Sequence, residues 1–265
     1  MNKKTNYSLI AGIVIISFFI AIALFAPVIA PYDHNEMGTP YLKPSQEHLL
    51  GTNDVGQDIL SELIYGTRVS LFIGVFAAVI ITAVGSVTAL CAGYFGGIVD
   101  KLITAFTSIA MALPSLPLTI LLVAYLGSGK WSLIVAMCVT AWTGTSRILR
   151  ARVQQVGQMP FVQIERAMGV ASPVILFKHI LPNLMDIILM RGSLSVANAM
   201  LTEASLSFLG LGTYGEKSWG TILHYAFFRN SIMRGQYWWY LPPIFCISFA
   251  VLGFMLAGYY GRRKR

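Results

Sequence analysis

Long apolar runs separated by short polar segments make up most of this chain. Six of these runs come close to, or exceed, the roughly 18 to 20 residues that a helix needs to cross a bilayer. They lie at about 9–30, 69–92, 102–126, 131–149, 184–208 and 240–260. The third run contains Pro114 and Pro117, which we expect to kink or interrupt its helix. The pattern predicts an all-α, polytopic membrane protein with six transmembrane helices.

The composition supports this fold class. Only 11% of the 265 residues are charged and the mean hydropathy is +0.68, whereas a soluble domain carries about 25% charged residues. The net charge of +8 would indicate a nucleic-acid partner only if the cations formed a basic soluble face. They lie instead in short loops and near the two ends of the chain, so we expect the lipid bilayer as a partner and no nucleic acid.

The distribution of lysine and arginine predicts the orientation. If the N-terminus is cytoplasmic, the inside segments hold twelve of the 19 Lys and Arg residues and the outside segments hold six, with Arg191 inside a span. Cytoplasmic loops carry the excess of positive charge, so both termini are expected in the cytoplasm. The first apolar run is longer than the apolar core of a cleaved signal peptide, which predicts an uncleaved anchor.

A compact polar segment at about 158–183 separates the fourth and fifth apolar runs. Phe161, Ile164 and Met168 recur at helical spacing, so "FVQIERAM" predicts a short amphipathic helix. Gly169 can end this helix with a left-handed cap.

A second short helix is expected directly after it. Ser172 followed by Pro173 is a suitable N-cap and first-turn pair. Pro182 is expected to end this helix, because a proline disfavours the α conformation in the residue before it, and Asn183 could then cap the fifth span. Two interpretations of the whole segment stay open on pattern alone: a docking site for another protein, or an amphipathic stretch lying on the lipid surface.

The chain shows no catalytic constellation. "GSGK" at 127–130 is similar to a phosphate-binding loop, but Ala124 stands where the first glycine of that motif belongs and Trp131 follows the lysine. The histidines of the outside segments match no compact metal-ligand spacing, and the three cysteines lie singly inside apolar runs, as small buried hydrophobic residues do. We therefore expect no enzyme activity and no cofactor or metal bound by this chain.

Two charged residues, Arg191 and Glu203, lie inside the fifth span. Charges within a span are costly and are functional candidates by default. The two are 12 residues apart, which is about 18 Å along a helix, so they cannot pair with each other. Each is a candidate for a pathway or gating role, and snorkelling of Arg191 to the interface is the alternative.

Several of these segments resemble one known family. "VQIERAMGVASPVILFKHILPN" resembles the cytoplasmic EAA loop of ABC-importer permeases, and Gly169, Ile180, Leu181 and Pro182 match its pattern. "HLLGTNDVGQDILSELIYGTRVSL", "AGYFGGIVDK", "ALPSLPL" and "EASLSFLGLG" resemble the second permease subunit of dipeptide, oligopeptide and nickel importers. The resemblance covers nearly the whole chain.

The resemblance implies a type I ABC importer permease in a prokaryotic cell membrane. The implied domains are an N-terminal anchor with an extracytoplasmic segment at 1–66, a permease domain at 67–260 and a basic cytoplasmic tail at 261–265. The implied partners are a second homologous permease, two cytoplasmic ATP-binding subunits that use the ATP, and an extracytoplasmic solute-binding protein. The cargo would be peptides, nickel chelates or similar small solutes. An autonomous secondary transporter or channel is the alternative, and it would need its own coupling-ion site.

The resemblance also assigns coupling to the ATPases to the polar segment. The residues expected to contribute are Phe161, Gln163, Ile164, Glu165, Arg166, Ala167, Met168, Gly169 and Pro182. The apolar members would fill a groove on an ATPase, with Glu165 and Arg166 at its rim. Gln163 stands where the family usually has a glutamate, and Asn53 and Gln57 stand where it often has aspartate and arginine.

Overall fold

The computed structural model describes residues 7–261. The lysines near the N-terminus and the basic residues after Gly261, which contribute to the predicted orientation, lie outside the described residues. Within 7–261 the chain is helical, apart from loops and one isolated bridge between Thr52 and Asp58. The elements in chain order are α1 (Tyr7–Ile29), α2 (Ile59–Phe95), α3 (Gly97–Ala112), α4 (Ser115–Leu126), α5 (Lys130–Gly157), α6 (Pro160–Ala167), α7 (Ser172–Val174), the π-helix η1 (Ile175–Ile180), α8 (Leu181–Leu206), the π-helix η2 (Ser207–Leu211), α9 (Trp219–Phe228) and α10 (Tyr237–Tyr260).

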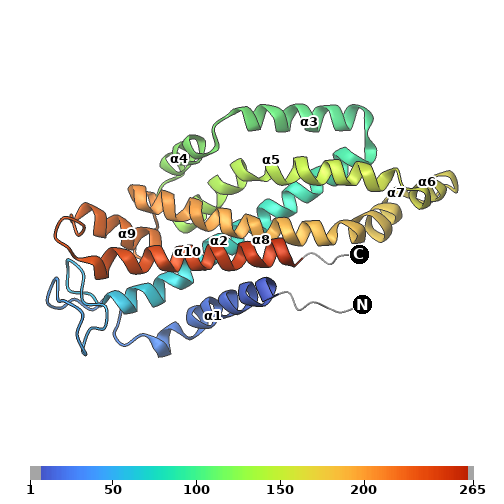
Figure 1. Cartoon of the computed structure of the whole chain (residues 1–265). Coiled ribbons are helices and arrows are strands. Elements are labelled where there is room, and N and C mark those ends of the chain that lie inside the picture. The colour runs from blue at the N-terminus through green and yellow to red at the C-terminus, as the bar shows by residue number, and fades with distance from the viewer. Residues whose placement is uncertain (1–6, 262–265) are drawn as a thin grey trace.

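Four long helices, α2, α5, α8 and α10, form the centre of an elongated bundle, with α1 along one edge and α3 along another (Figure 1). Glycines let α2 and α5 approach closely, as small residues do between membrane helices. A Cβ atom on Gly85 would lie 2.8 Å from the Cβ of Thr145, and one on Gly93 would lie 2.6 Å from the Cβ of Val153. The packing of α2 against α5 therefore depends on glycine at these positions.

Glycines also allow α1 and α10 to pack closely. A Cβ atom on Gly12 would lie 2.8 Å from the backbone nitrogen of Ala257, and one on Gly253 would lie 2.8 Å from a methyl group of Ile15. These contacts set the two helices antiparallel. The first turn of α1 and the last turn of α10 therefore lie at the same end of the bundle, on the side where α6 also lies (Figure 1).

Within the described residues, five helices are long and apolar enough to cross a membrane, and α3 with α4 gives a sixth if the pair is one span. The axes of α3 and α4 differ by 85°, and the break falls at Leu113 and Pro114, which are both extended. The prediction that prolines interrupt the third run is confirmed. Several helices are longer than the predicted runs, since α2 begins at Ile59 and α5 continues to Gly157.

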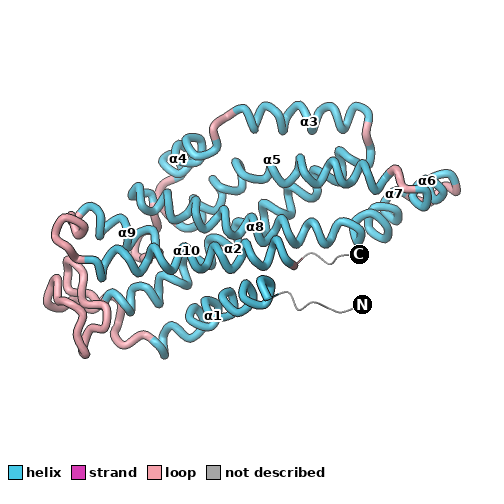
Figure 2. The backbone as a smooth tube through the Cα atoms, in the orientation of Figure 1, coloured by secondary structure: helices cyan, strands magenta, loops and turns pink. Residues whose placement is uncertain are grey.

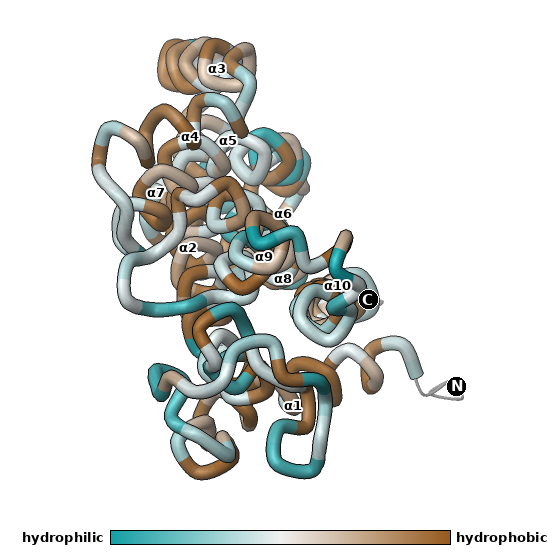
Figure 3. Tube along the Cα trace, turned by 90° about the vertical axis from the view of Figure 1, so that its left-hand side faces the viewer, coloured by the Kyte–Doolittle hydropathy of each residue, from teal (hydrophilic) through white to brown (hydrophobic). Residues whose placement is uncertain are grey.

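Loops gather at the end of the bundle away from α6 (Figure 2). Their hydrophilic residues contrast with the mostly hydrophobic helices (Figure 3). The short helix α9 packs there against α2, α8 and α10, and a capping box between Ser218 and Thr221 begins it. The fully buried Trp219 fixes it in place, because its indole N–H donates to the carbonyl oxygen of Leu63 at 3.1 Å. The sequence pattern did not predict this helix.

Candidate functional site

The polar segment predicted at 158–183 forms a projection at one end of the bundle (Figure 1). The predicted short helix is confirmed as α6. Met159 is extended and Pro160 occupies the first helical turn, where a missing N–H costs nothing and the fixed φ favours the helix.

Gly169 ends α6 in the predicted left-handed conformation, with φ +73°. The N–H of Val170 donates to the carbonyl oxygen of Glu165 at 3.1 Å, and the N–H of Gly169 donates to that of Arg166 at 3.1 Å. This pair of bonds is a Schellman motif, which satisfies the last carbonyls of a helix. A Cβ atom at Gly169 would meet no atom within 4 Å, so the backbone conformation, not space, favours glycine here.

One side of α6 is anchored and the other is free. Val162 is fully buried in a cluster that includes Tyr94 of α2 and Val153 of α5. Phe161, Ile164 and Met168 are 39%, 59% and 76% exposed, respectively. The structure therefore holds an exposed apolar surface rigidly at the end of the bundle.

The charged residues of α6 bind within the chain. A carboxylate oxygen of Glu165 lies 2.9 Å from Nε2 of His179 in η1. The guanidinium of Arg166 donates to the carbonyl oxygen of Tyr94 at 3.2 Å and lies 4.3 Å from the centre of the Tyr94 ring. Gln163 donates to the carbonyl oxygen of Gln158 at 3.2 Å. These contacts fasten α6 to α2, α5 and η1.

The second short helix is continuous with the long helix α8. This continuity corrects three predictions. Ser172 is already helical and makes no side-chain cap, Leu181 keeps α-helical angles before Pro182, and Asn183 donates to the carbonyl oxygen of His179 from inside the helix. The backbone of η1 explains how the helix continues. The N–H of Leu181 reaches back five residues to Leu176, and this wider turn relieves the clash that a proline ring makes in an α-helix.

Arg191 lines a small polar pocket within the bundle. The pocket has a volume of about 130 Å³ and is formed by α2, α4, α5 and α8. Thr119, Thr140 and Thr145 line it, and the guanidinium donates a long hydrogen bond of 3.5 Å to the hydroxyl of Thr145. No carboxylate pairs with Arg191 among the described residues. A cation inside a span without a carboxylate partner can attract an anionic or strongly polar group.

Three further polar residues of α8 line the same pocket, and the sequence-based interpretation missed them. Ser195, Asn198 and Thr202 follow Arg191 at intervals of four, seven and eleven positions, the spacing of one helical face. That periodicity is the signal that could have identified them.

Glu203 lies elsewhere, in the core. It is 1% exposed, its carboxylate accepts a hydrogen bond from Ser207 at 2.7 Å and another from Ser70 of α2 at 3.3 Å. The hydroxyl of Ser70 also accepts the backbone N–H of Trp219 at 3.2 Å. Glu203 thus joins α2, α8 and α9, and it does not line the Arg191 pocket.

The "GSGK" turn has a contact of its own. Lys130 begins α5 at the loop-rich end and forms an ion pair with Glu216 at 2.9 Å. The described residues also contain no group of three His, Cys, Asp or Glu side chains arranged to hold a metal ion.

The bundle of spans, the rigid amphipathic projection and the polar pocket between helices together define a membrane transport permease. Residues 81–265 match a family model described as a binding-protein-dependent transport system inner membrane component, and residues 4–46 match the N-terminal transmembrane domain of oligopeptide transport permease C. The chain belongs to this family of inner-membrane permeases of bacterial ABC importers.

Relatives of known name support the assignment. The chain is 37% identical over 225 residues to the oligopeptide transport system permease protein OppC of Bacillus subtilis, a match covering 84% of this chain and 74% of the relative. It is 34% identical over 258 residues to the dipeptide transport system permease protein DppC of the same organism, covering 96% and 80%. The glutathione transport system permease protein GsiD of Pectobacterium atrosepticum is 32% identical, with coverage of 96% and 85%.

A solved structure confirms the fold. A chain of the MetNI methionine ABC transporter in an inward-facing conformation superposes with a TM-score of 0.59 at 18% identity. The match covers 77% of this chain and 95% of the other. The architecture is therefore the type I ABC importer permease fold.

Proposed function

We propose that this chain, with a second homologous permease, forms the translocation path of an ATP-driven importer of peptides. The names of the relatives support peptide as the cargo, and nickel chelates or similar small solutes are the other candidates. In this proposal the chain hydrolyses no ATP and binds no cofactor. Two cytoplasmic ATP-binding subunits supply the energy, and an extracytoplasmic solute-binding protein delivers the cargo.

The exposed apolar side of α6 carries this proposal. Phe161, Ile164 and Met168 project at the end of the bundle from a helix that is fixed by the buried Val162. Burying such a face in a groove of an ATP-binding subunit would contribute a few kcal/mol, at about 25 cal/mol per Å² of apolar surface. The same face could lie on lipid, but the fixed orientation of α6 against η1 favours a shaped protein groove.

We also propose that the α6 end of the bundle is cytoplasmic. The excess of Lys and Arg in the predicted inside segments supports this orientation. The first turn of α1 and the last turn of α10 lie on the α6 side, so both termini would then be cytoplasmic.

Crosslinking tests the docking. The three native cysteines are replaced by serine, and a single cysteine is placed at Ile164 in the assembled complex. We expect a crosslink from this cysteine to an ATP-binding subunit and none from a matched cysteine at Glu216, at the opposite end. Failure of the Ile164 crosslink, with the ATP-binding subunits present in the complex, would contradict the docking of α6.

A second measurement tests the division of labour. ATP hydrolysis should be absent from the purified chain and should appear when the ATP-binding subunits are added. Substitution of Lys130 by glutamine should leave that activity unchanged, because this lysine pairs with Glu216 at the other end of the bundle.

A further inference from the structure

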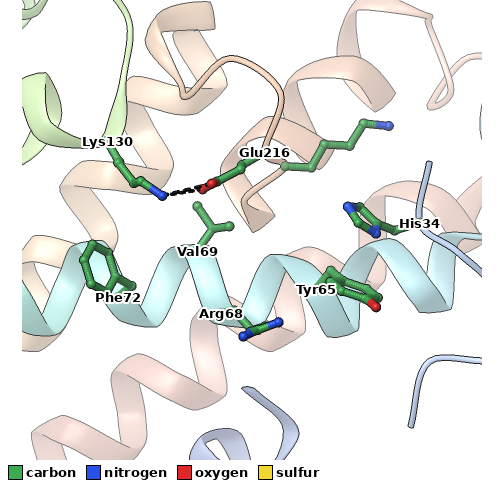
Figure 4. Close-up of a pocket in the computed structure, with 8 residues that line it drawn as sticks. His34, Tyr65, Arg68, Val69, Phe72, Lys130 and Glu216 are labelled. Atoms are coloured by element: carbon green, nitrogen blue, oxygen red, sulfur yellow. Dashed lines mark hydrogen bonds and ion pairs between the residues drawn. The ribbon is translucent and has the colours of Figure 1, made fainter. Parts of the chain in front are cut away.

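A second cavity lies at the loop-rich end of the bundle, and it shares no lining residue with the Arg191 pocket. It has a volume of about 470 Å³ and is bordered by α2, the start of α5, the loop before α9 and residue 34. Figure 4 shows the side chains that line it. The volume falls in the range of about 300 to 1,000 Å³ typical of sites for small molecules.

Positive charge predominates in this cavity. Arg68, Lys130 and Lys217 line it together with a single carboxylate, that of Glu216. Both oxygens of that carboxylate are taken by Lys130, at 2.9 and 3.2 Å. The acidic residue of the wall is therefore already neutralised.

Lys217 is neutralised as well. It forms an ion pair with Glu62, which is 1% exposed. Asn53 donates to the same carboxylate at 2.8 Å and to the side-chain oxygen of Gln57 at 3.0 Å. Lys217 also donates to Gln57. Asn53 and Gln57, which depart from the usual family residues, thus belong to a buried polar network behind the cavity wall.

Arg68 is the third cation of the cavity wall, and unlike Lys130 and Lys217 it has no carboxylate partner among the described residues. It is exposed on α2, and within residues 7–261 no hydrogen bond or ion pair engages its guanidinium. A guanidinium presents paired N–H donors that match a carboxylate with two parallel hydrogen bonds.

Flat and apolar groups line the same cavity as this cation. The ring of His34 stacks on that of Tyr65 with centroids 4.1 Å apart, as Figure 4 shows. Phe72 and Val69 line the wall toward Lys130. The cavity therefore offers one free cation beside apolar surface, which suits a small organic anion better than a free inorganic ion.

We propose that this cavity binds the carboxylate of a small solute, with Arg68 as the residue that contacts it. The choice of a peptide as that solute rests on the proposed function, and the group bound would then be its free C-terminal carboxylate. The cavity would be a binding subsite at the loop-rich end, separate from the Arg191 pocket.

Equilibrium binding tests the proposal. The full chain is purified into lipid nanodiscs, and binding of radiolabelled tri-alanine is measured by scintillation proximity, with tri-alanine amide as competitor. We expect the amide to compete about tenfold less well than unlabelled tri-alanine, since it lacks the charge that Arg68 recognises.

Substitutions locate the effect. Arg68→Gln should weaken tri-alanine binding about tenfold, and Arg68→Lys should weaken it less, because it keeps the charge but loses the paired donors. Lys43→Gln removes one positive charge from an exposed loop position outside the cavity and should leave binding unchanged. Equal competition by peptide and amide, unchanged binding in Arg68→Gln, or no binding at about 10 mM peptide would each overturn the proposal.

Uptake by the complete importer in proteoliposomes separates this inference from the proposed function. In one outcome, the wild-type importer takes up tri-alanine, and the Arg68→Gln variant discriminates peptide from amide as the wild type does. This result would support the proposed function and overturn the subsite. Arg68-dependent binding without import of tri-alanine would support the subsite and contradict peptide as the cargo. In a third outcome, Arg68→Gln reduces uptake of peptide and of amide equally and also weakens binding of the solute-binding protein. This result would show that the cavity receives an acidic side chain of that partner, and it would overturn the subsite.

Discussion

Glu165 and His179 meet at 2.9 Å between a carboxylate oxygen and Nε2, and this contact joins α6 to η1. The two side chains are 23% and 25% exposed, so the contact contributes up to about 1 kcal/mol. The contact matters mainly for geometry, because it helps fix the angle between α6 and the long helix formed by η1 and α8.

We therefore expect His179→Ala to loosen α6 without unfolding the chain. Solute uptake per ATP hydrolysed should fall by about two- to fivefold, the equivalent of up to about 1 kcal/mol. Lys178→Ala is the control, because it removes a neighbouring cation that has no partner among the described residues. Equal effects of the two substitutions would show that the Glu165 contact has no special role.

Gly169 provides a test of backbone conformation. Valine at φ +73° is strained, at a cost of about 1 to 2 kcal/mol, and we expect Gly169→Val to misalign α6 and reduce uptake more than ATP hydrolysis. Gly169→Asn should retain most of the activity, because asparagine tolerates this conformation. The measurement is the ratio of uptake to ATP hydrolysis in proteoliposomes. Similar losses in both variants would contradict the argument, since a Cβ atom at this position meets nothing within 4 Å.

Arg191 should affect movement of solute and not assembly. Arg191→Gln removes the cation from the polar pocket, and we expect reduced uptake in a complex that still contains its ATP-binding subunits. Arg191→Lys should fall between this variant and the wild type, because it keeps the charge. Wild-type uptake by Arg191→Gln would favour the alternative, in which Arg191 only anchors α8 near the interface.

The orientation can be tested by labelling intact cells. In a chain without native cysteines, single cysteines at Lys43 and Glu216 should react with an impermeant reagent added from outside. A cysteine at Gln155, near the α6 end and exposed, should not react until the cells are opened. Labelling of Gln155→Cys in intact cells would reverse the proposed orientation.

The sequence predicted features that depend on neighbouring residues. Helix α6, its glycine cap and the break at Pro114 follow from the spacing of apolar residues, from φ preference and from the missing proline N–H. The 85° angle between α3 and α4 is not encoded in such local terms, because it depends on how each helix packs.

Two errors have the same physical origin. Pro182 was expected to end a helix, yet the wider turn at η1 lets the helix continue, with the fully buried Ile175 and Ile180 packed into the bundle. Similarly, α9 depends on the burial of Trp219 against α2, more than a hundred residues away in the chain. Neither arrangement can be recognised from a short window of sequence.

The continuity of helix through Pro182 has a mechanical consequence. From Ser172 to Leu206 the backbone keeps helical angles, a length of about 50 Å at 1.5 Å per residue. If this helix moved as one rigid body, a tilt of about 5° about its middle would move each end by about 2 Å. Arg191 and Glu203 both lie on this helix, so a displacement of its α6 end would then be transmitted to the polar pocket and to the far end of the bundle, because the helix is not interrupted at Pro182.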